Sequence, residues 1–166
     1  DKFRGSATAA EVAGAIARGA QTVGRPCRTL PLADGGEGTL DALGGPNRTT
    51  RVSGPLGAPV EAAWRLDGEL AVVEMARASG LALVGGADGN EPLAASTRGT
   101  GELIAAALEA GATRVVVGVG GSATTDGGLG AVEALGARPF AGVRVEVACD
   151  VQTLFVDAAP VFAPQK

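Results

Sequence analysis

Glycines and hydroxyl side chains alternate between residues 118 and 128, in the run GVGGSATTDGG. Glycine lets a backbone approach a ligand closely, and amides at the start of a helix attract anions. Because the run lies between an apolar strand pattern and a helical pattern, it predicts a phosphate-binding loop with Asp126 as a candidate metal ligand. The binding candidates are Gly120, Gly121, Ser122, Thr124 and Asp126. The alternative is a tight turn in which Asp126 caps the following helix.

A second glycine-rich segment, ADGGEGT, follows the apolar run CRTLPLA. It places Asp34, Gly35, Gly36 and Glu37 together, and these carboxylates suit either Mg²⁺ or the hydroxyl groups of a small polyol. We therefore consider Glu37 a second candidate metal ligand. The same spacing also fits a helix cap at Asp34 with Glu37 at the third position.

The segment STRGTG offers Ser96, Thr97 and Arg98 at a predicted helix start. An anion is favoured there, and a guanidinium group can bind it through two hydrogen bonds. Serine and threonine are also ordinary helix caps, so this segment is weaker evidence for a site.

The opening residues gather two cations and two oxygen-bearing side chains: Asp1, Lys2, Arg4 and Ser6. A cation at this position could clamp a carboxylate or a phosphate. The alternative is a solvated terminus, which is common for first residues.

Several classes of enzyme and partner are disfavoured. The chain has no GxxxxGK[ST] motif, no protein-kinase signature and no histidine. The net charge is −4 and no basic run occurs, which argues against nucleic acid or an anionic membrane surface as partners. No apolar run approaches the roughly 20 residues of a membrane span, and we expect a cytoplasmic protein with Cys27 and Cys149 buried and reduced.

Hydrophobic patterns predict the elements that carry these segments. Thr8 and Glu11 have capping-box spacing and begin a helix whose buried stripe includes Val12 and Ile16. CRTLPLA predicts a short buried strand, and three strand-like runs between residues 49 and 76 predict an antiparallel meander. A helix over residues 96–111, a strand at RVVVGVGG, a helix near residues 131–135 and a strand at VRVEVACDV follow.

Strands that alternate with helices indicate parallel βαβ units. We predict an α/β protein with a Rossmann-like parallel sheet lobe and a second, smaller α/β lobe that contains antiparallel strands. Residues 1–46 and 92–166 would form the first lobe, and residues 47–91 part of the second.

Taken as a set, these segments resemble the glycerate kinase family. DKFRGS is similar to the family's opening motif, and PLADGGEGT, MARASGLALV, ASTRGTGELI, GVGGSATTDGG, ACDV and FAPQK follow in the family's order. The resemblance covers essentially the whole chain, although the family usually has a longer segment between Pro139 and Gly142.

The resemblance implies an ATP-dependent kinase that phosphorylates D-glycerate with Mg²⁺, in a cleft between two lobes. On that basis Asp150 or Asp34 would orient the substrate hydroxyl and Arg4 would bind substrate carboxylate or phosphate. Asp1, Lys2, Ser6 and the residues of ADGGEGT would contribute to the glycerate site, and the glycine-rich loop with Ser96 and Thr97 to the ATP site. The oligomeric state stays open, with a homodimer as one arrangement.

Two other functions fit parts of the sequence. Gly118, Gly120 and Ala123 match the GxGxx[GA] pattern of dinucleotide-dependent oxidoreductases. A non-catalytic fragment that binds a sugar acid is the third hypothesis.

Overall fold

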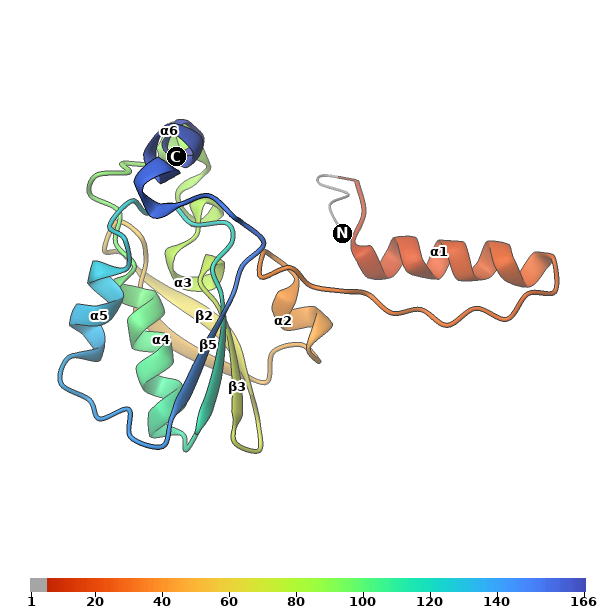
Figure 1. Ribbon diagram of the computed structural model, residues 1–166, viewed down its shortest axis with the longest axis horizontal. Helices are drawn as coiled ribbons and strands as arrows, with labels where there is room; N and C mark the ends of the chain where they lie inside the picture. The colour runs from red at the N-terminus through yellow and green to blue at the C-terminus, as the bar shows by residue number, and fades with distance from the viewer. Residues whose placement is uncertain (1–5) are drawn as a thin grey trace. The chain divides into compact units, whose positions relative to one another are not determined.

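The computed structural model describes residues 6–166, and the chain divides into two compact units at residues 34 and 35 (Figure 1). The lobe boundaries expected near residues 46 and 91 remain a prediction.

The first unit contains one helix, α1 (Ala9–Thr22). Its start confirms the predicted capping box, because the Thr8 amide donates to Glu11 Oε2 at 2.8 Å and the Glu11 amide donates to Thr8 Oγ1 at 3.2 Å. The hydrogen bonds from Thr8 hold the pKa of the Glu11 carboxyl below its usual value. These bonds satisfy amides that the helix itself leaves without acceptors.

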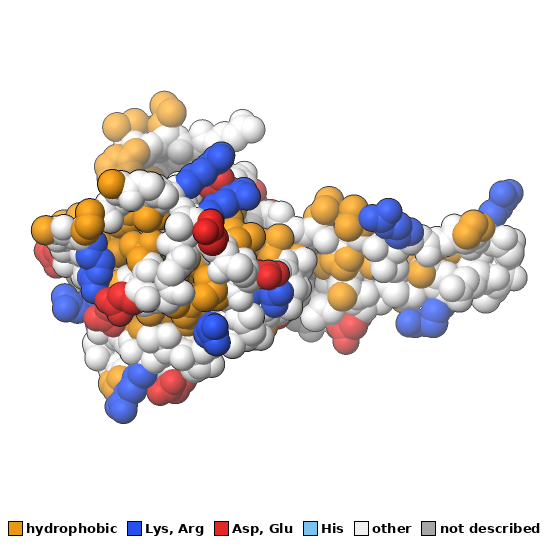
Figure 2. All heavy atoms as spheres, turned by 90° about the horizontal axis from the view of Figure 1, so that it is seen from below, with side chains coloured by type: hydrophobic (Ala, Val, Ile, Leu, Met, Phe, Trp, Pro, Cys, Tyr) orange, Lys and Arg blue, Asp and Glu red, His pale blue; other side chains and the backbone are white. Residues whose placement is uncertain are grey.

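The buried stripe predicted for this helix is wrong. No residue of α1 is buried, and Ile16 is 63% exposed; Figure 2 shows apolar side chains at the surface of this helix. The physical reason lies in the unit itself, because its described residues contain no second helix or strand against which a stripe could pack.

The short buried strand predicted at CRTLPLA is also absent from the structure. Residues 25–34 adopt no regular structure, and Cys27 is exposed. Pro26 and Pro31 lack amide donors, and a strand needs a neighbouring strand for its hydrogen bonds. Cys149, predicted to be buried, is exposed as well.

The second unit is built on a five-stranded sheet in the order β1-β2-β3-β4-β5. The antiparallel meander is confirmed, since β1 pairs with β2 and β2 with β3 in antiparallel register. β3, β4 and β5 are parallel, which confirms the mixed α/β class. The strands are β1 (Arg48–Ser53), β2 (Pro59–Asp67), β3 (Leu70–Glu74), β4 (Arg114–Gly118) and β5 (Arg144–Ala148).

Helices α4 (Arg98–Glu109) and α5 (Leu129–Leu135) connect the parallel strands and lie side by side (Figure 1). Leu103 and Ala107 of α4 are fully buried against β-strand residues such as Val73, as the helical pattern predicted. The shorter helices are α2 (Thr39–Ala42), α3 (Ala76–Ser79) and α6 (Ala158–Phe162), with 3-10 helices at Leu81–Val84, Ala87–Gly89, Phe155–Asp157 and Ala163–Gln165.

The core of the second unit consists mainly of valine, alanine and leucine, and Trp64 is its large aromatic residue. The Trp64 indole donates to Thr50 Oγ1 at 2.9 Å, so its polar atom is satisfied inside the sheet. Within residues 6–166, no helix is long and apolar enough to cross a bilayer.

Candidate functional site

The carboxyl ends of the three parallel strands lie level with one another. Glu74 at the end of β3 pairs in register with Gly118 at the end of β4, and Gly118 pairs with Ala148 at the end of β5. The segments that follow these strands therefore leave the sheet at one edge. In parallel α/β sheets this edge is the usual place for ligands.

The predicted phosphate loop contacts the second glycine-rich segment at this edge. The Gly120 amide donates to the Gly35 carbonyl at 2.9 Å. A Cβ atom on Gly120 would lie 2.5 Å from the Gly36 Cα, and one on Gly121 would lie 3.2 Å from Glu37 Oε1. The structure thus brings together Gly35, Gly36, Glu37 and the loop, and the absence of side chains on the glycines permits the contact.

Ser79 at the end of α3 and Leu81 just after it hold the loop through two backbone hydrogen bonds. The Leu81 amide donates to the Gly121 carbonyl at 2.8 Å, and the Ala123 amide donates to the Ser79 carbonyl at 2.9 Å. Inside the loop, the Thr124 amide donates to Ser122 Oγ at 3.0 Å. Among the described residues, the amides of Gly121 and Ser122 donate to no protein group, so both are available to a ligand.

Asp126 joins the start of α4 to the start of α5. Its carboxylate accepts hydrogen bonds from the Thr97 amide at 2.8 Å, Thr97 Oγ1 at 2.7 Å, and the amides of Gly128 and Gly130 at 3.1 Å each. Burial raises the pKa of Asp126, but these hydrogen bonds outweigh burial and hold the pKa below its usual value.

These contacts also place Ser96 and Thr97. Thr97 is buried, and its hydroxyl both donates to Asp126 and accepts from the Ala131 amide at 2.9 Å. Ser96 lies close by, because a Cβ atom on Gly130 would be 2.1 Å from Ser96 Oγ. The capping alternative describes Asp126, which accepts from the Gly128 and Gly130 amides at the start of α5, whereas Thr97 occupies the N-cap position of α4 without a side-chain capping bond. The roles of both residues in metal and ATP binding remain predictions.

The remaining predicted site residues are exposed, lie in the first unit, or lie outside the described residues. Glu37 and Asp150 are exposed, and Asp150 follows the end of β5. Within residues 6–166 no cluster of three metal-ligating side chains occurs. Ser6 and Asp34 belong to the first unit, while Asp1, Lys2 and Arg4 lie outside the described residues. Their roles stay predictions.

Sequence reasoning missed Glu74, a carboxylate that is only 2% exposed. It accepts hydrogen bonds from the Leu40 amide at 2.7 Å and from Arg77 Nε at 3.0 Å. Glu74 therefore connects the end of β3 to α2, the helix that follows the Gly35–Glu37 segment. The signal in the sequence was a single acidic residue at the end of the apolar run LAVV.

Lys166 and Asn90 were also missed. The Lys166 ammonium donates to the carbonyl of Ser122, in the loop of residues 118–128. Asn90 is 8% exposed, and its Nδ2 donates to the carbonyls of Ala123 and Lys166 at 2.9 and 3.0 Å. These contacts join residues that are 44, 33 and 76 positions apart, so no local sequence pattern indicates them.

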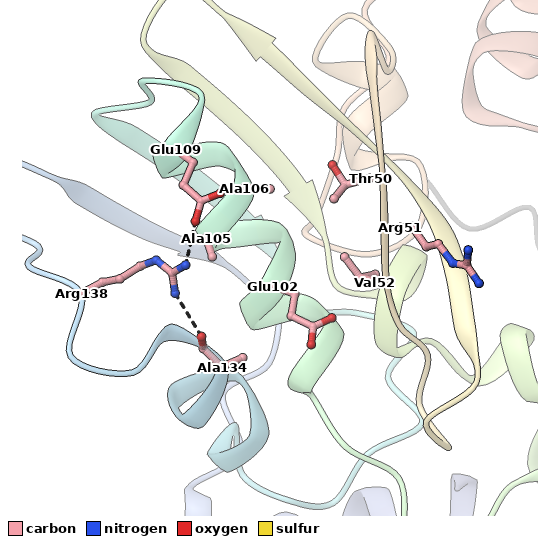
Figure 3. Close-up of a pocket in the computed structure, with 9 residues that line it drawn as sticks. All are labelled: Thr50, Arg51, Val52, Glu102, Ala105, Ala106, Glu109, Ala134 and Arg138. Carbon is pink, nitrogen blue, oxygen red and sulfur yellow. Dashed lines mark hydrogen bonds and ion pairs between the residues drawn. The ribbon is translucent and has the colours of Figure 1, made fainter.

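A separate depression of about 250 Å³ lies between β1, α4 and α5 (Figure 3). Arg138 pairs there with Glu109 at 2.7 Å and donates to the Ala134 carbonyl at 3.2 Å. Because no residue of the glycine-rich loops lines it, this depression is not the candidate site.

Several proteins of known sequence are similar to this chain. A family model for the glycerate kinase family matches residues 1–142. A glycerate kinase of Bacillus subtilis (strain 168) is 45% identical over 206 residues, which span 100% of this chain and 54% of the relative. A glycerate 2-kinase of Escherichia coli (strain K12) is 49% identical over 146 residues, which span 83% of this chain and 38% of the relative.

The fold of the chain is similar to that of a protein whose crystal structure is known. A protein of Salmonella typhimurium LT2, assigned as glycerate kinase 2, matches with a TM-score of 0.81 and 36% identity, over 99% of this chain and 55% of that one. The chain spans about half the length of the curated relatives that it matches from end to end. The Bacillus subtilis alignment, at 206 residues, is longer than the 166 residues of this chain. The longer segment expected between Pro139 and Gly142 stays a prediction.

Proposed function

The chain belongs to the glycerate kinase family, and on that premise we propose that the full-length protein transfers the γ-phosphoryl group of ATP to D-glycerate. The products would be ADP and a phosphoglycerate, with 2-phosphoglycerate favoured by the relative named glycerate 2-kinase. The observation that carries the proposal is the contact between the loop of residues 118–128 and the Gly35–Glu37 segment at the carboxyl edge of the sheet.

The loop supplies what a triphosphate needs from a protein backbone. The amides of Gly121 and Ser122 are available as donors, and backbone amides of glycine-rich loops bind phosphate in other proteins. Such donors are already oriented before the substrate binds, because the carbonyl of Gly121 and the amide of Ala123 are fixed by residues 79–81. Oriented dipoles stabilise the charge that develops during phosphoryl transfer.

The residues present fit Mg²⁺ in the way that kinases commonly bind it. Magnesium is usually held by one or two carboxylates together with substrate phosphates, rather than by a cage of protein ligands. The Glu37 carboxylate lies against Gly121 of the loop and would serve as such a ligand. Asp126 is less suited, because four protein donors already occupy its oxygens. Bound Mg²⁺ would neutralise phosphate charge.

The acceptor hydroxyl needs a carboxylate to orient it and to accept its proton. Asp150 is placed at the carboxyl edge by β5, and Asp34 directly precedes Gly35 in the chain. We assign this role to one of these two residues. Arg4, with Asp1, Lys2 and Ser6, would bind the glycerate carboxylate or a phosphate.

A coupled assay of ADP release by the full-length protein tests this function. ADP release that requires D-glycerate, ATP and Mg²⁺ together supports the proposal. Thermal stabilisation by NAD(P)H but not by MgATP would instead support the oxidoreductase hypothesis, and absence of turnover with both substrates bound would support a binding fragment.

A further inference from the structure

The phosphate loop itself contains no cation. Residues 118–128 include the carboxylate of Asp126 and no lysine or arginine. A triphosphate carries several negative charges, and in other phosphate-binding loops a lysine meets them. The two arginines on neighbouring segments are engaged, because Arg77 pairs with Glu74 at 3.0 Å and Arg98 pairs with Glu102 at 3.1 Å.

Lys166 brings an ammonium group to this loop from the far end of the chain. Its Nζ donates to the carbonyl of Ser122, the residue whose own amide is available to a ligand. An ammonium has three N–H donors, so two remain for an anion. Within residues 6–166, Lys166 forms no ion pair with a carboxylate.

The contact is supported by a buried side chain. Asn90 donates to both the Ala123 carbonyl and the Lys166 carbonyl, and so ties the loop to the turn Ala163–Gln165. Its Oδ1 atom is buried and has no donor among the described residues. A buried acceptor without a partner is costly, which marks this junction as a place where a ligand or a further group is needed.

We infer that Lys166 is the phosphate-binding cation of this site, with its ammonium directed by the Ser122 carbonyl toward phosphate oxygens that the Gly121 and Ser122 amides also contact. The inference deepens the proposed function and rests on it. Lys166 forms no bond to phosphorus and transfers no proton in this role. It neutralises charge on the nucleotide, as a Walker lysine does in another fold.

The energetics of Lys166 agree with an anionic ligand. Burial lowers the pKa of its ammonium, because the charged form loses contact with water and the protein gives only part of the compensation. A bound triphosphate would supply that compensation.

The test uses the full-length protein with Lys166→Gln, the charge-preserving Lys166→Arg, and Gln165→Ala as a control in the same turn. We expect Lys166→Gln to lower kcat/KM for MgATP by about 10- to 100-fold, mainly through a higher KM for MgATP. This is the scale of a lost charge-assisted hydrogen bond. KM for glycerate should change little, Lys166→Arg should recover part of the loss, and Gln165→Ala should resemble the wild type.

A purely structural role predicts a different pattern. It would lower the melting temperature, affect both substrates alike and leave Lys166→Arg no better than Lys166→Gln. That pattern, or unchanged MgATP kinetics in Lys166→Gln, overturns the inference.

Chemical labelling separates the inference from the proposed function. Trinitrobenzenesulfonate modifies accessible lysines, and peptide mapping reports Lys166 by itself. MgATP should slow labelling of Lys166 and adenosine, which lacks phosphates, should not. If MgATP binds and gives no protection, the inference fails even though the protein phosphorylates glycerate. If MgATP protects Lys166 but glycerate is not phosphorylated, the proposed acceptor fails and the inference stands.

Discussion

Gly35 is the position at which the site should be most sensitive to a single methyl group. Its φ of +88° is in the left-handed region, and a Cβ atom there would lie 2.1 Å from the Ala148 carbonyl oxygen and 2.5 Å from its carbon. Both obstacles are backbone atoms at the end of β5, so a side-chain rotation cannot relieve them. Gly35→Ala must therefore push the Gly35–Glu37 segment away from the sheet.

The loss of stability in Gly35→Ala has two parts. An alanine in the left-handed conformation costs about 1–2 kcal/mol, and forcing a methyl group into a packed contact costs about 1–3 kcal/mol more. The free energy of unfolding should fall by about 2–5 kcal/mol in total. Because the segment must retreat by roughly 1 Å, kcat/KM should also fall, by up to about 100-fold.

Gly38→Ala is the matched control. Gly38 has a φ of +93°, but a Cβ atom there would meet nothing within 4 Å, so only the conformational cost applies. Both substitutions also reduce the freedom of the unfolded chain by the same amount, which cancels in the comparison. Urea unfolding and steady-state kinetics of the two variants measure the difference. A Gly35→Ala variant as stable and active as Gly38→Ala would refute the close contact between this segment and β5.

Substitutions at four further residues test separate parts of the site. Asp126→Asn should lower the free energy of unfolding at pH 7 by about 1–2 kcal/mol. Because the pKa of Asp126 is lowered in the folded state, the stability that its carboxylate contributes is present above the usual carboxyl pKa and is lost as the pH falls through the folded pKa. Urea unfolding near pH 3 should therefore show a smaller difference between the variant and the wild type. Glu74→Leu should lower the free energy of unfolding by about 2–4 kcal/mol, because the Leu40 amide and Arg77 lose their acceptor. Glu74→Gln should lower it less. Equal urea midpoints for the wild type and Glu74→Leu would contradict this. Either Asp150→Asn or Asp34→Asn should lower kcat by about 10²- to 10⁴-fold with little change in KM, and full kcat in both variants would exclude the assignment of the carboxylate.

The fold of the second unit could be predicted in large part because its signals are local. The alternation in the meander and the helical spacing of Leu103 and Ala107 are properties of short windows. The capping residues Thr8 and Glu11 of the first unit are a signal of the same local kind. The glycine-rich loops were found in the same way, since glycine and hydroxyl residues cluster visibly between an apolar strand and a helix.

Predictions failed where the outcome depends on a distant partner. The apolar stripe of α1 and the run CRTLPLA are patterns that promise burial, but burial requires a surface that the described part of the first unit does not provide. Lys166 and Glu74 were missed for the related reason that their partners, Ser122 and Leu40, are remote in sequence. The chemistry of such residues becomes visible only when the chain has folded.

The central claim is that the backbone of residues 118–128 holds the nucleotide's phosphates. A crystal structure of the full-length protein with Mg²⁺ and a non-hydrolysable ATP analogue tests it most directly. Phosphate oxygens should lie within about 3.2 Å of the Gly121 or Ser122 amide nitrogen. Phosphates bound to another segment, with both amides facing only solvent, would contradict it.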